Sequence, residues 1–276
     1  MTESMGSAQA WSAVAQAWDT NADYVDEHSV EATATLLDRL SVRSGGRLLE
    51  LAAGPGSLGA TWSQLVGPTG TVVVSDIAPG MVEVARRRNQ ALGNVETAVI
   101  DAAAIDRPDA SFDVVACRMG LMFTPNPSDA FVEIQRVLRP DGRLGALTWG
   151  GIEHNPWMSC VGMAAMVTGL VSGGPPVGPG GIFSLGDPTD LAALAKGAGF
   201  VDVTVEAISI TFRAENTDAH VDRVSSLAGP LAAALQTASN DQIVALRRTA
   251  ADLAAPYLSA NGLEIPGQAL LVSGRR

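Results

Sequence analysis

Leu48–Gly59 has the sequence LLELAAGPGSLG, which is the strongest structural signal in the chain. Its first residues, apolar apart from Glu50, predict a buried strand. Gly54 and Gly56 flank a proline and predict a tight turn, after which a helix begins. Glycines in such a turn let the backbone approach a ligand closely, and the amino end of the helix offers free N–H groups to a negative charge. Gly54–Gly59 matches GxGxxG, which fits dinucleotide-binding enzymes as well as others and, by itself, an ordinary strand–helix turn.

Further short apolar runs, each bounded by Gly, Pro or Asp, predict strands on both sides of this stretch, with helical segments between them. Such alternation predicts a parallel sheet with helices on both faces. After Thr148 the regular alternation of strands and helices ends. The glycine- and proline-rich Ser172–Gly181 is expected to be irregular and to act as a mobile gate. The expected strands are Arg47–Leu51, Thr71–Ser75, Val95–Ile100, Phe112–Cys117, Arg143–Thr148, Val201–Phe212 (one strand or two with a bend) and Gly262–Val272. The expected helices are Trp11–Tyr24, Val30–Leu40, Pro79–Leu92, Pro127–Leu138, Asn155–Leu170, Pro188–Ala198 and most of Thr217–Ala255.

Composition narrows the class of protein. The 276 residues suffice for a large core, and 47% hydrophobic against 17% charged residues excludes disorder for most of the chain. The net charge of −11 disfavours a nucleic-acid partner. Two cysteines outside any CxxC pattern predict neither a disulfide framework nor a zinc site, and we see no metal-spaced cluster. Without a signal peptide or an apolar run that spans a bilayer, we expect a cytoplasmic protein and leave a homodimer open.

Two further acidic residues follow predicted strands. Asp76 ends the second strand (VVVSD), where a carboxylate accepts both hydroxyls of a ribose; the alternative is an N-cap for the next helix. Asp101 follows the third strand, where its carboxylate would accept an adenine amino group while the N–H of Ala102 donates to a ring nitrogen; the alternative is a simple loop aspartate. Glu50 discriminates between ligands, because an acid before the glycine turn sits poorly beside a pyrophosphate and well beside an ammonium group. The expected ligand therefore joins an adenosine ribose to a cationic amine.

The chain resembles the Rossmann-like (class I) S-adenosylmethionine-dependent methyltransferases. It is most similar to the group that includes the ubiquinone/menaquinone-biosynthesis C-methyltransferases and many natural-product methyltransferases. Five blocks occur in the family's order and spacing within about Trp11–Trp149: LLELAAGPG, VVVSDIAPGMVEVARRR, VIDAAAI, SFDVVACRMGLMF and EIQRVLRPDGRLGALTW. The family's usual first glycine is Ala52 here, as the quinone-type subgroup tolerates.

The resemblance implies an α/β fold with a seven-stranded, mostly parallel sheet whose last strand is antiparallel, helices on both faces and an α-helical lid insertion. It implies a single domain over 1–276, with cap helices at 1–45, a cofactor-binding core at 46–150 and lid insertions at 151–185 and 213–260. It also implies S-adenosylmethionine as cofactor, with S-adenosylhomocysteine as product.

The resemblance assigns a role to each matching position. The methionine end would be held by Glu50 and by the backbone of Ala52, Gly54, Gly56 and Arg118. The ribose would be bound by Asp76, and the adenine by Ile77, Met81, Asp101, Ala102 and Ala103. Trp18 and Tyr24 resemble aromatic residues that close over the cofactor, although plain packing explains Trp18 equally well.

The acceptor side is expected after the fourth and fifth strands, and its apolar residues predict a small hydrophobic acceptor such as a phenol, a quinone precursor or a polyketide. His154 is the preferred general base, with an exposed loop histidine as the alternative. His28 is a weaker candidate, and His220 is expected to be solvated. The residues expected to line the acceptor side are Met119, Met122, Phe123, Trp149 and Trp157.

Two other functions stay open from the sequence. An NAD-dependent oxidoreductase is supported by the GxGxxG match and Asp76, but Glu50 and the five ordered blocks argue against it. A methyltransferase-like binding protein without turnover would use the same cofactor residues. Methyl transfer itself is a direct displacement that needs alignment and exclusion of water, and a base only where the acceptor must lose a proton.

Overall fold

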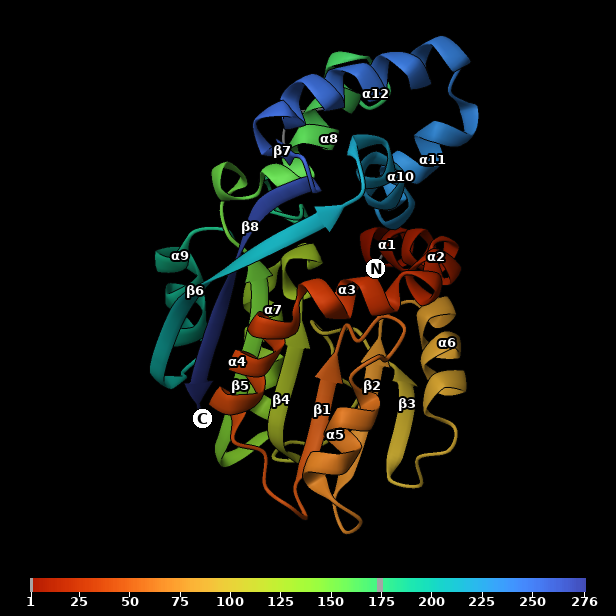
Figure 1. Cartoon of the computed structure of the whole chain (residues 1–276). Coiled ribbons are helices and arrows are strands. Elements are labelled where there is room, and N and C mark those ends of the chain that lie inside the picture. Colours follow the sequence, from red (N-terminus) through yellow and green to blue (C-terminus); the bar gives the residue numbers. More distant parts are fainter. Residues whose placement is uncertain (1, 173–175) are drawn as a thin grey trace.

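The computed structural model describes residues 2–172 and 176–276. Within them the strands form one sheet in the order β3-β2-β1-β4-β5-β8-β6, and a short β7 pairs with β8 (Figure 1). The strands β1 to β5 are parallel, and β8 runs antiparallel to both β5 and β6, which confirms the expected sheet with its antiparallel last strand. The strands are β1 (Arg47–Leu51), β2 (Thr71–Asp76), β3 (Val95–Val99), β4 (Phe112–Arg118), β5 (Leu138–Trp149), β6 (Val201–Ala214), β7 (Leu258–Ser259) and β8 (Gly262–Arg275).

Helices cover both faces of this sheet (Figure 1). On one face, α4 (Val30–Leu40) packs on β5, β6 and β8, and α5 (Gly59–Val66) packs on β1 and β2. On the other face, α7 (Pro127–Val137) and α9 (Pro188–Gly197) pack against each other. α6 (Pro79–Asn89) contacts β2 and β3. Because the central strands are buried on both faces, their sequences are nearly continuous runs of Val and Leu.

The amino-terminal segment forms three short helices, α1 (Thr2–Ala13), α2 (Ala15–Thr20) and α3 (Ala22–His28), where the sequence predicted one helix over Trp11–Tyr24. The breaks fall at Val14 and Asn21. The side chain of Asn21 donates to the carbonyl of Ala17, 2.9 Å away, and such local bonds compete with continuous helix.

A second group of helices lies beyond the carboxyl ends of the parallel strands (Figure 1). It consists of α8 (Pro156–Val167), α10 (Thr217–Leu227), α11 (Gly229–Thr237) and α12 (Asn240–Ala254), and α10 contacts the other three. We call these four helices the lid. Short 3-10 helices occur at Leu121–Phe123, Ile152–His154 and Ala255–Tyr257.

One strand begins earlier than the sequence predicted, and another settles an alternative that the sequence left open. β5 begins at Leu138, directly after α7, where the sequence predicted a strand from Arg143. β6 is a single strand, because its partner β8 pairs with it from Val201 to Ala214. Of the irregular stretch Ser172–Gly181, residues 173–175 lie outside the described residues. In the part of the chain that the structure describes, no helix is long and apolar enough to cross a membrane.

The two glycines of the β1–α5 turn both have positive φ, but their surroundings differ. A Cβ on Gly54 (φ +56°) would meet no atom within 4 Å, whereas a Cβ on Gly56 (φ +71°) would lie 2.7 Å from the Cβ of Ala85 on α6. The side chain of Asn89 also donates to the carbonyl of Gly56 at 3.0 Å. The turn is therefore packed against α6 at Gly56 and open at Gly54.

We predict that Gly56→Ala lowers the free energy of unfolding by about 3 kcal/mol, because strain from positive φ adds to a steric clash. Gly54→Ala, the matched control, carries the strain alone and should lose about 1 kcal/mol. Urea unfolding of both variants measures the difference, and equal losses would contradict this packing.

Candidate functional site

Four charged residues predicted as ligand-binding positions lie at one edge of the sheet. Glu50 is in β1, Asp76 ends β2, Asp101 follows β3 and Arg118 ends β4. These strands are parallel and adjacent, with Glu50 in register with Val74 of β2 and Ala116 of β4. The structure thus brings these four positions to the carboxyl edge of the sheet, where ligands bind in folds of this kind.

A backbone hydrogen bond to β2 holds the turn after β1 in place. The N–H of Ala53 donates to the carbonyl of Ser75, 2.8 Å away. Ala52 adopts positive φ (+50°), a conformation usually left to glycine. Its Cβ has room because Gly120 lies opposite, where an added Cβ would be 2.2 Å from that of Ala52. The glycine opposite Ala52 therefore accommodates this departure from the family pattern, and no motif in the sequence indicated that these two residues would meet.

Asp76 is buried, and both its oxygens accept backbone hydrogen bonds. Oδ2 accepts from the N–H of Gly54 and Oδ1 from the N–H of Ala78, each at 2.9 Å. Burial raises the pKa of Asp76, and these N–H groups oppose part of the rise. Because each carboxylate oxygen has two lone pairs, acceptor capacity for two hydroxyl groups is left.

Glu50 is 2% exposed, and its Oε2 accepts no hydrogen bond from any residue that the structure describes. Burial raises the pKa of Glu50 to about 7, and the positive charge of Arg118 opposes part of that rise. The buried indole N–H of Trp62 also opposes part of the rise, although its geometry falls outside that of a regular hydrogen bond. A buried carboxylate that lacks a partner is destabilising unless a cation or donor completes it.

Arg118 was predicted to contribute its backbone, but its side chain forms the densest polar contact of the site. The guanidinium donates to Oδ1 of Asp26 on α3 at 2.6 Å and to Oγ of Ser57 after the glycine turn at 2.8 Å. It also donates to the hydroxyls of Ser29 and Thr33 at 3.2 and 3.3 Å. Arg118 therefore ties the amino-terminal helices to the glycine turn.

The positions predicted to bind adenine are spread over two environments. Asp101, Ala102 and Ala103 are half-buried in the loop after β3, where Oδ1 of Asp101 accepts from the N–H of Ala103 at 2.9 Å. Ile77 is half-buried, whereas Met81 is 2% exposed. Met81 belongs to a small apolar cluster with residues of the amino-terminal helices, namely Trp11, Val14, Ala15 and Trp18, and with Ala78, Val84 and Ala232.

Trp18 and Tyr24 both connect the amino-terminal helices to the lid. The indole N–H of Trp18 donates to the carbonyl of Leu227 at the end of α10, 3.1 Å away. The guanidinium of Arg223 on α10 lies over the ring of Tyr24, 3.9 Å from its centroid. Both aromatic residues thus lie where amino-terminal helices and lid meet.

The predicted acceptor residues fall into two groups. Trp149 and Trp157 come together at a ring-centroid distance of 4.8 Å, and Trp157 stacks on Phe212 of β6 at 4.2 Å. We call these three rings the aromatic cluster; sequence reasoning missed Phe212 because it lies in the interior of a long strand. The other group follows β4: Met119 and Phe123 are half-buried and Met122 is fully buried.

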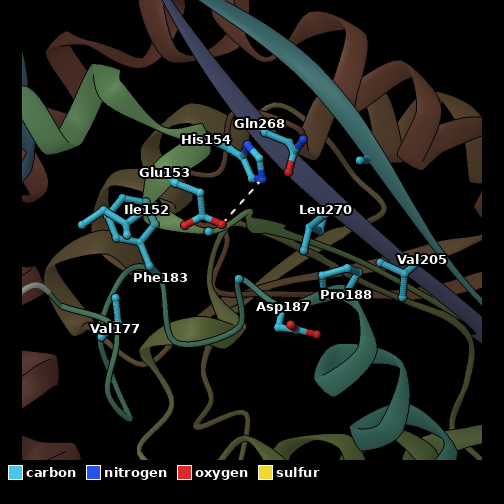
Figure 2. A pocket seen from close by; sticks show the side chains of 13 residues that line it. Ile152, Glu153, His154, Val177, Phe183, Asp187, Pro188, Val205, Gln268 and Leu270 are labelled. Carbon is cyan, nitrogen blue, oxygen red and sulfur yellow. Dashed lines mark ion pairs between the residues drawn. The ribbon is translucent and has the colours of Figure 1, made fainter.

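The histidines are placed differently from one another. His154 lies in an open cleft of about 480 Å³, with its Nε2 3.6 Å from Oε1 of Glu153 (Figure 2). Gln268 and Leu270 also line this cleft, and none of the residues predicted to bind the cofactor or acceptor does. The role of His154 as a general base stays a prediction.

The expectation that His220 is solvated was wrong, because this residue of the lid helix α10 is only 1% exposed. Its segment is polar on the outside, and His220 is on the inward side of α10 with Val221 and Val224. His28 is half-buried, and both its ring nitrogens contact backbone groups, the carbonyl of Tyr24 at 2.8 Å and the N–H of Arg213 at 3.0 Å.

Comparison with known proteins finds relatives of the segment of the chain that forms this sheet edge. Residues 49–146 match a family model described as a methyltransferase domain. Over 113 residues the chain is 42% identical to the ubiquinone/menaquinone biosynthesis C-methyltransferase of Hahella chejuensis, a match that covers 39% of this chain and 45% of that relative. The chain thus spans less than half of the length of the curated relatives it matches.

Solved structures resemble the whole fold at low sequence identity. The YcgJ protein of Bacillus subtilis has a TM-score of 0.61 and 19% identity, over 89% of this chain and 98% of that chain. Phosphoethanolamine N-methyltransferase 2 of Haemonchus contortus, solved with S-adenosyl-L-methionine, has a TM-score of 0.58 and 17% identity, over 94% of this chain and 57% of that chain. At these identities the likeness concerns the fold.

The raised pKa of Glu50 predicts a pH-dependent stability. The unfolded chain has the ordinary pKa of 4.5 and the folded chain one of about 7, so the protonated form stabilises the fold. That stabilisation is fully present below the unfolded value and is lost as the pH rises through the folded value. Glu50→Gln keeps the shape without the charge, and should exceed wild type in unfolding free energy by about 3 kcal/mol at about pH 8, with little difference near about pH 4. Urea unfolding at both values measures this, and a difference that does not change with pH would contradict it.

Proposed function

The chain carries a class I, S-adenosylmethionine-dependent methyltransferase domain, and on that premise we propose that the protein transfers a methyl group to a small hydrophobic acceptor. One observation supports the cofactor choice most strongly: the carboxylate of Glu50 is buried beside the glycine turn, and its Oε2 accepts no hydrogen bond from the described residues. An ammonium group completes such a carboxylate, whereas the pyrophosphate of NAD would be repelled by it. The amino group of S-adenosylmethionine has the required charge.

The remaining cofactor positions agree with this assignment. Asp76 has acceptor capacity left for two ribose hydroxyls, and the open space at Gly54 leaves the backbone of the turn approachable. We assign the methionine end to Glu50 and to the backbone of Ala52, Gly54, Gly56 and Arg118. The adenine is assigned to Ile77, Met81, Asp101, Ala102 and Ala103.

The chemistry needs little from the protein beyond alignment and dryness. When bound, S-adenosylmethionine supplies a methyl group that its sulfonium already activates. The chain's residues would orient both reactants and exclude water, which strengthens electrostatic interactions inside the site. Trp18 and Tyr24 serve this enclosure, because each joins an amino-terminal helix to α10 of the lid.

The acceptor class is inferred from the buried aromatic cluster, from the net charge and from the matching relatives. The aromatic cluster of Trp149, Trp157 and Phe212 favours a flat, apolar molecule. The net charge of −11 disfavours nucleic acid. The matching relatives are named for quinone biosynthesis. We therefore propose a phenol, a quinone precursor or a polyketide-like acceptor.

We propose that the whole chain works as one unit. Residues 1–45 would form the cap, 46–150 the cofactor-binding core, and 151–185 with 213–260 the lid and acceptor side. The bonds from Arg118 to Asp26 and from Trp18 to Leu227 support this division, because each joins segments far apart in sequence.

Calorimetric titration tests the cofactor assignment. We expect wild type to bind S-adenosylmethionine and S-adenosylhomocysteine in the micromolar range and NAD not at all. Asp76→Ala should weaken both sulfur ligands by about 100-fold, because two hydrogen bonds to a charged group are lost. The matched control is Asp113→Ala, which removes an acid at the amino end of β4, where it accepts from Arg47 and Arg139.

Binding of NAD alone, or equal weakening by both substitutions, would overturn the assignment. Methyl transfer is then tested on the same proteins by the formation of S-adenosylhomocysteine with simple hydroquinones and naphthols as acceptors. Wild type and Asp113→Ala should form it and Asp76→Ala should not. No product with any acceptor of the panel would count against a hydrophobic phenolic acceptor.

A further inference from the structure

His220 on α10 has one ring nitrogen bonded and the other free. Its Nε2 lies 2.6 Å from the carbonyl oxygen of Trp157. Its Nδ1 is buried and has no hydrogen-bond partner among the residues that the structure describes. The side chain as a whole is 1% exposed.

The bond to Trp157 fixes the tautomer. A carbonyl oxygen only accepts, so Nε2 must carry the proton and Nδ1 must present a lone pair. Burial lowers the pKa of His220, and the nearby Arg223 on its own helix and His28 on α3 lower it further, which keeps the ring neutral. An acceptor buried without a donor costs about 1–3 kcal/mol of stability, so its presence calls for an explanation.

The other two histidines offer no comparable group. His28 uses both nitrogens on backbone groups of Tyr24 and Arg213. His154 is 53% exposed and lies beside Glu153 in the cleft of Figure 2. Among the three histidines, His220 alone combines burial with an unpaired lone pair.

The neighbourhood of His220 is aromatic. Trp157, whose carbonyl accepts the hydrogen bond from His220, stacks its ring on that of Phe212. The rings of Trp157 and Trp149 are also in contact. The ring of His28 also stacks on Phe212, with ring centroids 5.6 Å apart and an interplanar angle of 3°. The lone pair therefore lies near a buried aromatic cluster, which a flat ring can reach only when the lid that carries His220 moves aside.

We propose that Nδ1 of His220 accepts a hydrogen bond from a hydroxyl group on the aromatic ring of the methyl acceptor, which packs against the aromatic cluster. This inference rests on the proposed function and narrows its acceptor to hydroxylated aromatic compounds. The hydroxyl supplies the donor that Nδ1 lacks. A methyl acceptor without a hydroxyl group leaves Nδ1 of His220 buried and unpaired, so that methyl acceptor binds more weakly.

Two probes that differ in this one donor test the proposal. 1-Naphthol carries the hydroxyl, and 1-methoxynaphthalene has the same rings without it. Binding is measured by ligand-observed NMR and calorimetry, with and without S-adenosylhomocysteine. We expect wild type to bind 1-naphthol about tenfold more tightly than the ether, the effect of one hydrogen bond to an otherwise unpaired buried group.

His220→Gln is the decisive variant, because its amide N–H can still donate to the carbonyl of Trp157 while no acceptor occupies the place of Nδ1. It should bind the two probes equally. His220→Asn places an amide oxygen near the position of Nδ1 and should restore part of the preference. Asp113→Ala, the control at the amino end of β4, should keep the full preference of wild type.

Equal affinity of wild type for the two probes, including no binding of either, would overturn the proposal. So would a preference that survives in His220→Gln. Affinity for S-adenosylhomocysteine is read separately, and its retention in His220→Gln shows that the variant is folded. If wild type does not bind S-adenosylhomocysteine, the result counts against the cofactor assignment instead, so the two failures are distinguishable.

Discussion

The site is organised around the buried carboxylate of Glu50, whose Oε2 accepts no hydrogen bond from the part of the chain that the structure describes. Glu50 lies in β1, an inner strand, at the edge where ligands bind, and burial raises its pKa to about 7. The neighbouring charge of Arg118 opposes only part of that effect, since the guanidinium is bonded to Asp26 and Ser57. A fold that keeps such a group accepts a loss of stability in the free protein, as functional sites often do. A cationic ligand would remove that loss.

The enclosure of the site depends on bonds between distant segments. Arg118 holds α3 on the glycine turn, and α2 and α3 reach the lid through Trp18 and Tyr24. The amino-terminal helices thus lie between the cofactor edge and the lid.

Local sequence was sufficient where a residue's role follows from its place at a strand end. The stretch around Gly54 and the acid at Asp76 were both interpreted correctly as a turn and a strand terminus, because apolar runs and glycines encode them locally. Residues whose partners come from distant segments escaped prediction. The side chain of Arg118, the ring of Phe212 and the burial of His220 all depend on tertiary packing. The polar segment around His220 suggested solvent, yet one side of α10 faces the lid interior.

Carbon-13 NMR of the side-chain carboxyl of Glu50, in the free protein and with S-adenosylhomocysteine bound, measures the pKa of Glu50 and tests its role most directly. The free protein should show a carboxyl that titrates near 7. The bound form should titrate below about 5, because an ammonium group within a few ångströms favours the charged carboxylate. A titration near the ordinary value in the free protein, or one that saturating ligand leaves unchanged, would contradict the central role of Glu50.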